Sequence, residues 1–294
     1  MLGIIAAIFA YFLFALGNIF EKILRSNHLK SPLTIILLEG IAILPFLLIP
    51  FFYNVNTTDY WNIALSMLAG ALSIAGFLSY LVALKKEEAS KLVSLWNISP
   101  LITLILAFFI LQEKLPPNFY LAFALIFLGG ILISRKDLRG VSSHGFYLMM
   151  LSNLLYSIAV VITKFVFNNM GFLDFIFYSG VCNTIISFSV LIPKNIRPTL
   201  INDIRKIENR DILIGYLVVI PIAWILYWFS VNQLPVSIVL VFGGMQSAFV
   251  FILALFLSFK FPKILKEDIN KEAIAIKIVS ILLMLIGLYI LGTK

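Results

Sequence analysis

Ten apolar runs of about 20 residues each constrain what this chain can fold into. An α-helix rises ~1.5 Å per residue, so a run of that length crosses a hydrocarbon core of ~30 Å. Stretches such as Ile102 to Leu111 are apolar on every face, which excludes the alternating pattern of barrel strands. The ten runs are residues 2–20, 33–52, 62–84, 92–111, 117–133, 145–163, 173–193, 212–230, 236–259 and 274–292. The sequence therefore predicts an all-α integral membrane protein with ten transmembrane helices.

The composition agrees with a membrane protein and excludes other classes. Of the 294 residues 62% are hydrophobic and 12% are charged, whereas soluble domains have about 45–50% and roughly 25%. The net charge of +8 is carried by short Lys and Arg clusters between apolar runs, so we expect no nucleic-acid partner. Cys182 is the only cysteine, which excludes an intramolecular disulfide. No basic residue precedes residues 1–20, so we expect a first helix there rather than a signal peptide.

Proline marks three helix starts, and one linker is unusually long. Ser31-Pro32, Pro116-Pro117 and Leu234-Pro235 precede the second, fifth and ninth runs, where proline is tolerated because the first turn needs no N–H donor. The polar linker from Pro193 to Asp211 has room for a short surface helix.

The two halves of the chain resemble each other. Matching residues of the two halves lie 142 residues apart near the start of each half, then 147 and finally 158 residues apart. This separation grows where loops differ in length. The matches include Lys22 with Lys164, Tyr80 with Tyr227 and Gly129 with Gly287. We predict a first five-helix repeat at 1–134, a linker at 135–144 and a second five-helix repeat at 145–294. Because five is odd, the second repeat enters the membrane with opposite orientation, giving the inverted topology of many secondary transporters.

The basic residues predict an orientation. Of 22 Lys and Arg residues, all but Lys114, Lys164 and Lys294 lie in or beside loops that follow odd-numbered helices. The positive-inside rule places those loops in the cytoplasm and both termini outside.

No motif for hydrolysis or phosphoryl transfer is present, so we expect neither an enzyme nor a cofactor or metal site. The two histidines, His28 and His144, lie at loop positions and are expected at the surface. The one clear intramembrane acid is Glu39, six residues into the second run. A carboxylate at such depth indicates a functional role by default, here proton coupling. The alternative is a structural ion pair with Lys22 or Lys30.

The fourth and ninth helices carry matching interruptions. The fourth contains Trp96-Asn97-Ile98-Ser99-Pro100, and the ninth contains Gly243-Gly244-Met245-Gln246-Ser247 at the equivalent place. Interruptions at corresponding positions of two halves are typical of a carrier's binding site, while close packing through small residues is the alternative. Lys164 closes the sixth helix, where we expect it to reach toward the headgroups; an anion or substrate contact is the alternative.

Polar and aromatic residues on neighbouring helices are the candidates for substrate binding. They share positions near the interruptions or near helix centres, where an interfacial aromatic belt explains them poorly. The candidates are Tyr11, Tyr80, Trp96, Asn97, Asn153, Tyr156, Trp224, Tyr227 and Gln246, with Trp228 nearby.

Several short motifs resemble those of one transporter family. They are Glu88-Ala89-Ser90-Lys91-Leu92-Val93, Ser99-Pro100-Leu101-Ile102-Thr103, Leu111-Gln112-Glu113-Lys114-Leu115, Leu128-Gly129-Gly130-Ile131-Leu132 and Ser31-Pro32-Leu33. Together they are similar to the EamA-type members of the drug/metabolite transporter superfamily. The resemblance implies a ten-helix carrier whose cavity is lined by helices one, three, four, six, eight and nine, with helices five and ten at the periphery. In related short members acidic residues couple transport to protons.

The chain departs from that family in three ways. Members often have Arg where Glu39 stands, so the role of Glu39 is not inherited. The second half has Lys260-Phe261-Pro262 in place of Glu-Lys-Leu. Members generally have cytoplasmic termini, opposite to the orientation that the basic residues predict.

These observations predict a secondary active transporter in the plasma membrane that exports small organic metabolites such as amino acids by alternating access. Its expected partners are the lipid bilayer and a small-molecule substrate, and we expect a monomer or a homodimer. The alternative function is a membrane scaffold or sensor that transports nothing.

Overall fold

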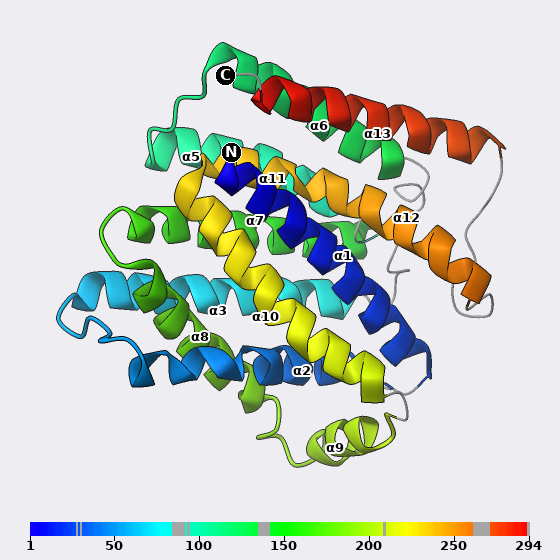
Figure 1. Ribbon diagram of the computed structural model, residues 1–294. Helices are drawn as coiled ribbons and strands as arrows, with labels where there is room; N and C mark the ends of the chain where they lie inside the picture. The colour runs from blue at the N-terminus through cyan, green and yellow to red at the C-terminus, as the bar shows by residue number, and fades with distance from the viewer. Residues whose placement is uncertain are drawn as a thin grey trace.

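The computed structural model describes residues 1–27, 29, 31–83, 92, 95–134, 142–207, 210–260 and 271–292, and every regular element within them is a helix (Figure 1). His28, Lys30 and residues 135–141 of the predicted linker lie outside these ranges. The longer helices are α1 (Leu2–Asn27), α2 (Leu33–Ile43), α3 (Tyr60–Ala83), α5 (Ser99–Ile110), α6 (Pro117–Ser134), α7 (Ser143–Phe167), α8 (Phe172–Ser189), α10 (Arg210–Gln233), α12 (Gly243–Lys260) and α13 (Lys271–Gly292). The shorter ones are η1 (Leu44–Phe51), η2 (Trp96–Ile98), α9 (Arg197–Arg205) and α11 (Val236–Val241).

Within the described residues, seven helical spans are long and apolar enough to cross a membrane. They are Leu2–Leu24, Leu33–Phe51, Tyr60–Ala83, Ser143–Phe167, Phe172–Ser189, Arg210–Gln233 and Val236–Leu253. Shorter apolar helices occupy the other three predicted runs, at Trp96–Ile110, Pro117–Leu132 and Ile278–Leu291. The all-helical fold is therefore confirmed, and the protein is a multi-pass membrane protein.

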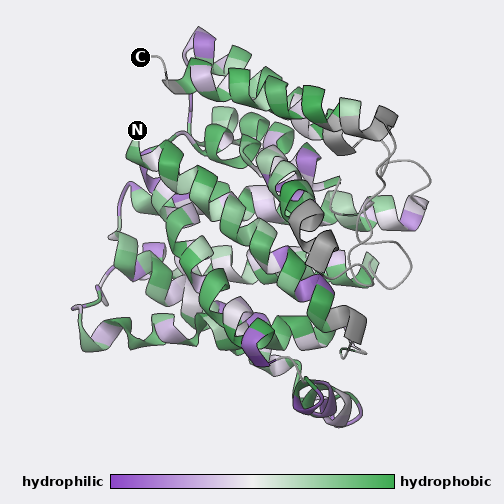
Figure 2. Cartoon of the chain, turned by 45° about the vertical axis from the view of Figure 1, so that its right-hand side comes forward, coloured by the Kyte–Doolittle hydropathy of each residue, from purple (hydrophilic) through white to green (hydrophobic). Residues whose placement is uncertain are grey.

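The outer surface of the helices is apolar. Large hydrophobic side chains such as Phe109 and Ile185 are 73% and 61% exposed, and Tyr289 is 73% exposed. Figure 2 shows hydrophobic residues along most of each helix, with hydrophilic residues concentrated in loops, near helix ends and on α9. Apolar exposure on this scale is expected where lipid rather than water contacts the protein.

The prolines mark helix starts as predicted. Pro32 and Pro235 are the residues just before α2 and α11, and Pro117 is the first residue of α6. Helix α9 confirms the predicted short helix in the linker between the seventh and eighth runs. Two further prolines of the second run, Pro45 and Pro50, lie in η1, so this span continues from α2 as a 3₁₀-helix, a feature that the sequence analysis did not anticipate.

Close backbone contacts set how the helices pair. Helix α1 packs against α10, α3 against α7 and α8, and α6 against α13. At Gly70 of α3 an added Cβ would lie 2.5 Å from the backbone oxygen of Ser179 in α8. At Gly129 of α6 it would lie 2.7 Å from Met284 Cγ in α13. Glycine is required at both places because the neighbouring helix occupies the space of any side chain.

A carboxylate of α9 fastens the start of α2. The Asp203 side chain is 2% exposed, and its Oδ2 accepts hydrogen bonds from Ser31 N and Thr34 Oγ1, both at 2.9 Å. Asp203 thus fixes the segment that leads into α2 from a distant helix, while Ser31 Oγ accepts the N–H of Leu33, the first residue of α2.

Candidate functional site

The fourth and ninth predicted helices are both irregular, and the irregularities lie near the predicted positions. In the fourth, η2 (Trp96–Ile98) precedes α5, and Pro100 lies in the first turn of α5. In the ninth, α11 ends at Val241 and α12 begins at Gly243. Gly244 approaches Gly130 of α6 so closely that an added Cβ would lie 3.2 Å from the Gly130 Cα. Small residues therefore serve close packing at the ninth-helix interruption, which was the alternative reading.

Aromatic residues from distant parts of the chain form a connected cluster, which we call the aromatic cluster. Its first group is Tyr80, Trp96 and Tyr156, with ring centroids 4.6 Å apart for Tyr80 and Trp96 and 6.4 Å apart for Trp96 and Tyr156. The second group is Tyr11, Trp224 and Tyr227, with Tyr227 6.1 Å from Tyr11 and 5.6 Å from Trp224. Tyr80 and Tyr227 are both electrostatic neighbours of Tyr156, which links the groups.

Glu39 lies beside this cluster. Tyr216 of α10 donates its hydroxyl proton to Glu39 Oε1 at 3.1 Å, and Trp224 lies near the carboxylate. Glu39 is also an electrostatic neighbour of Tyr156. Lys22, one of the predicted ion-pair partners, is exposed, and Lys30 lies outside the described residues. The neutral hydroxyl of Tyr216 thus takes the place of the predicted ion pair with Lys22.

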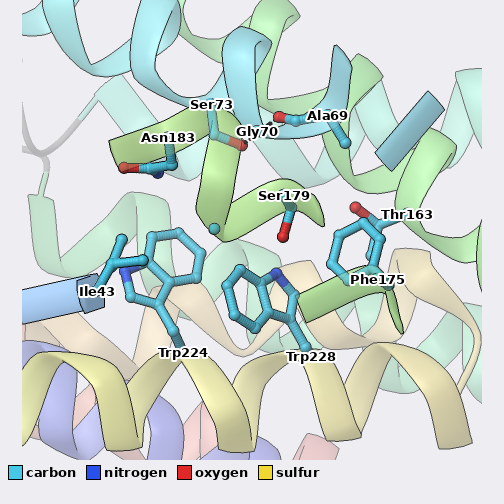
Figure 3. Close-up of a pocket in the computed structure, with 11 residues that line it drawn as sticks. Ile43, Ala69, Gly70, Ser73, Thr163, Phe175, Ser179, Asn183, Trp224 and Trp228 are labelled. Carbon is cyan, nitrogen blue, oxygen red and sulfur yellow. Dashed lines mark hydrogen bonds between the residues drawn. The ribbon is translucent and has the colours of Figure 1, made fainter. Parts of the chain in front are cut away.

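A pocket adjoins the cluster at Trp224. The pocket lies among helices α2, α3, α7, α8 and α10. It has about 340 Å³ of empty space, including its open mouth. Figure 3 shows the indoles of Trp224 and Trp228 on one side, both from α10. Their ring centroids are 5.4 Å apart and the rings are stacked. Phe175 adds a third ring, 5.6 Å from Trp228.

The opposite side of the pocket is polar, and the sequence analysis predicted none of its polar residues. The polar residues that line the pocket are Ser73, Thr163, Ser179 and Asn183. Three of them bond within their own helix: Ser73 Oγ donates to Ala69 O, Thr163 Oγ1 to Ala159 O and Ser179 Oγ to Ile176 O. The signal that could have found this wall is the polar face of α8, where Ser179, Asn183 and Ser187 recur every four residues in an apolar helix.

Three predicted site residues have other surroundings. Asn97 is 6% exposed and donates from Nδ2 to Gly130 O at 3.0 Å, so it joins the packing of η2 against α6. Asn153 is fully buried and donates from Nδ2 to Leu95 O at 2.9 Å, while its Oδ1 has no hydrogen-bond partner among the described residues. Gln246 is half-buried in α12. Their contact with substrate stays a prediction.

The expectation for Lys164 is wrong. Instead of extending to the headgroups, its Nζ donates to Val231 O, Asn232 O and Leu234 O at 2.9, 3.0 and 2.9 Å. Val231 and Asn232 lie in the last turn of α10, and Leu234 follows its last residue. Val231 O has no helical donor because the residue four positions later is Pro235. Three N–H groups meet three acceptors, which is the full donor capacity of an ammonium.

Glu113 completes the same structure from the other half of the chain. Its Oε1 accepts from Val236 N at 2.7 Å, and its Oε2 accepts from Ser237 Oγ at 2.7 Å. Lys164 and Glu113 are also electrostatic neighbours. The turn between α10 and α11 is thus held by a cation at its carbonyls and an anion at its N–H groups; we call this arrangement the turn clamp.

Comparison with known proteins finds a family match for the first half of the chain. Residues 1–135 match the model of the EamA-like transporter family. Uncharacterized protein MJ1333.1 from Methanocaldococcus jannaschii is 29% identical over 137 residues, which are 47% of this chain and 96% of that protein. A protein known from its crystal structure matches over 98% of this chain and 94% of its own, with a TM-score of 0.69 and 13% identity, and shares the fold. The resemblance found in the motifs is therefore confirmed over residues 1–135, which match the EamA-like transporter family, a family of the drug/metabolite transporter superfamily.

Proposed function

We propose that this protein is a secondary carrier that exports a small organic metabolite by alternating access, with the aromatic cluster and the pocket of Figure 3 as its binding region. The observation that carries the proposal is the position of Tyr156. This residue keeps part of its surface accessible although α7 packs against α3, α5, α8 and α10, and residues from both halves surround it. Pockets formed between helices of a bundle are usual places for small ligands.

We also propose ten spanning helices arranged as two inverted repeats, 1–134 and 145–294. In this arrangement α1 is equivalent to α7, α2 to α8, α3 to α10, α5 to α11 and α12, and α6 to α13. The contact α1–α10 then corresponds to α7–α3, α1–α12 to α7–α5, and α3–α8 to α10–α2. All of these pairs of helices are in contact. Three further pairs, α2–α8, α5–α11 and α6–α13, join equivalent helices. A pattern of this symmetry supports a pseudo-two-fold axis in the membrane plane. The relative from Methanocaldococcus jannaschii aligns over 96% of its length with only 47% of this chain, which supports a unit of half the chain's length.

The transport proposal is tested by flux through the purified protein. In liposomes, we expect the protein to exchange labelled metabolites, and Tyr156→Ala to reduce the flux about ten-fold by removing the residue that joins the two groups of the cluster. Tyr147→Ala on the same helix is the control, because Tyr147 is 71% exposed. A folded protein that gives no flux across a broad metabolite panel would favour the scaffold or sensor alternative.

Glu39 is the proposed proton-coupling residue. Its carboxylate is half-buried beside Tyr216 and Trp224, and a single acid in such a place can load a proton from one side and release it to the other. We expect a pH gradient to accelerate flux in the native protein and to have no effect on Glu39→Gln, which keeps the size and polarity of the side chain. Flux measured with and without the gradient decides the matter, and equal acceleration in both proteins assigns Glu39 to structure.

A further inference from the structure

The segment that joins α8 to α10, with α9 at its centre, presents a strongly basic surface. Its exposed cations are Lys194, Arg197, Arg205, Lys206 and Arg210, which we call the α9 cations. Among the acids of the segment, Asp203 is only 2% exposed, Asp211 is exposed, and Glu208 lies outside the described residues. The exposed cations therefore outnumber the acids that are not buried, and within the part of the chain that the structure describes none of them forms an ion pair.

Helix α9 is fixed on the bundle by one face only. Leu200 is fully buried, and Ile207, just after the helix, is 6% exposed in the apolar cluster formed with α2 and α10. Asp203 lies on the same side and accepts the hydrogen bonds from the start of α2. Arg197 and Arg205 lie about two helical turns apart and are both exposed, so they belong to the side of α9 that no described part of the protein covers.

Helix α9 lies where three membrane spans end. The span Phe172–Ser189 leads into the segment, the span Arg210–Gln233 follows it, and the span Leu33–Phe51 begins beside Asp203. Figure 1 shows α9 at the edge of the bundle, beside α2 and the start of α10. The side chain of Ile192, between the end of α8 and the first of the α9 cations, is 78% exposed. Exposed apolar and basic side chains at the level where spans end are typical of a segment in the membrane interface.

Anionic phospholipids fit this surface better than soluble anions do. Three of the five α9 cations are arginines, whose planar guanidinium binds two oxygens of one phosphate at the same time. A lipid also offers acyl chains to Ile192, whereas free phosphate or an acidic peptide leaves this side chain in water. The predicted orientation places this side of the protein in the cytoplasm, where the leaflet attracts basic segments by its negative surface potential.

We propose that α9 and the α9 cations form a binding surface for anionic phospholipids, whose phosphates are held by Arg197 and Arg205. This surface lies outside the pocket of Figure 3 and does not depend on the proposed carrier function. A lipid bound to α9 stabilises the folded protein, because the α9 that it recognises is the helix docked on α2 through Asp203.

Two lipids with the same acyl chains and different headgroup charge test the proposal. Native mass spectrometry of the full-length protein, titrated with phosphatidylglycerol or with phosphatidylcholine, should give the anionic lipid an affinity about ten-fold or more above that of the zwitterionic lipid. In Arg197→Gln/Arg205→Gln the affinity for phosphatidylglycerol should fall about ten-fold or more, while that for phosphatidylcholine stays unchanged. Equal affinities for both lipids in the native protein overturn the proposal.

Lys22→Gln/Lys114→Gln is the matched control, because it removes the same charge at exposed positions outside α9. Equal losses of phosphatidylglycerol binding in the two double variants would show a general effect of net charge and would overturn the assignment to α9. Thermal unfolding in nanodiscs separates lipid binding from folding. Phosphatidylglycerol should raise the Tm of the native protein and of the control, whereas the double arginine variant should keep its Tm in phosphatidylcholine and lose this increase.

Competition at constant ionic strength identifies the kind of anion that the surface binds, since screening by salt then stays the same. Neither millimolar inorganic phosphate nor a soluble poly-glutamate peptide should displace bound phosphatidylglycerol. Displacement by phosphate would assign the α9 cations to a soluble anion, and displacement by the peptide alone would assign them to an acidic protein. Either result overturns the lipid assignment.

Discussion

Replacing Lys164 by methionine should lower the free energy of unfolding by about 3 kcal/mol or more, because hydrogen bonds to a charged group contribute roughly 1.5–3 kcal/mol each and their loss leaves buried carbonyls unpaired. Three carbonyls at the end of α10 depend on this ammonium. The carbonyl of Val231 has no substitute donor, since Pro235 offers no N–H. Methionine keeps the length of the side chain, so the change tests the donors rather than the packing. Denaturant titration in detergent micelles measures the effect.

Lys22→Met is the matched control. Lys22 occupies the position equivalent to Lys164 in the proposed first repeat, but its side chain is exposed. Its replacement should change stability by less than about 0.5 kcal/mol, as surface substitutions usually do. Similar losses in both variants would show that the three carbonyl contacts contribute little.

Replacing Gly70 by alanine should cost about 2 kcal/mol of stability, in the range of overpacked cores, and should also reduce transport. The added Cβ would lie 2.5 Å from Ser179 O and 3.2 Å from Ser179 Cα. Both atoms belong to the backbone of α8, so no rotation of a side chain relieves the contact, and α3 must move away from α8. Gly70 and Ser179 both line the pocket, so the same movement changes the binding region.

Gly243→Ala separates this steric effect from the general consequence of replacing a glycine. A Cβ at Gly243 would lie 3.5 Å from the Tyr11 ring, an ordinary van der Waals distance. Its substitution should be neutral or should stabilise the protein by about 0.4–1 kcal/mol through the unfolded chain. Unfolding titrations and flux assays on both variants give the comparison. Equal stability of Gly70→Ala and the native protein would contradict the close approach of α3 and α8.

The sequence predicts the helices well because apolar length alone decides where a chain can cross lipid. The starts at Pro117 and after Pro235 also follow from a local rule, since proline fixes the first turn by its own geometry. Lys164 was misjudged for the opposite reason. Its acceptors lie 67 to 70 residues further along the chain, and no local pattern connects a lysine with carbonyls at that separation.

The candidate site was predicted in part for similar reasons. Tyr80, Trp96 and Tyr156 could be selected because large polar aromatics are conspicuous in apolar helices, and the structure brings them together. Tyr216 was missed as the partner of Glu39, which lies 177 residues away in sequence. Ser73 and Ser179 of the pocket wall resemble the small residues that merely pack helices, and only the face that Ser179 shares with Asn183 on α8 is a distinguishing signal.

The turn clamp bears on how the protein is made. Glu113 emerges from the ribosome well before its partners, which follow 123 and 124 residues later. Lys164 likewise emerges before the three carbonyls that it binds are synthesised. During that interval both charges need water or lipid headgroups as temporary partners, because hydrocarbon offers none. Insertion of the early helices therefore leaves an incomplete assembly. Once the α10–α11 turn is synthesised, it provides the protein partners of Glu113 and Lys164, and the contact of Glu113 with this turn joins the two halves of the chain.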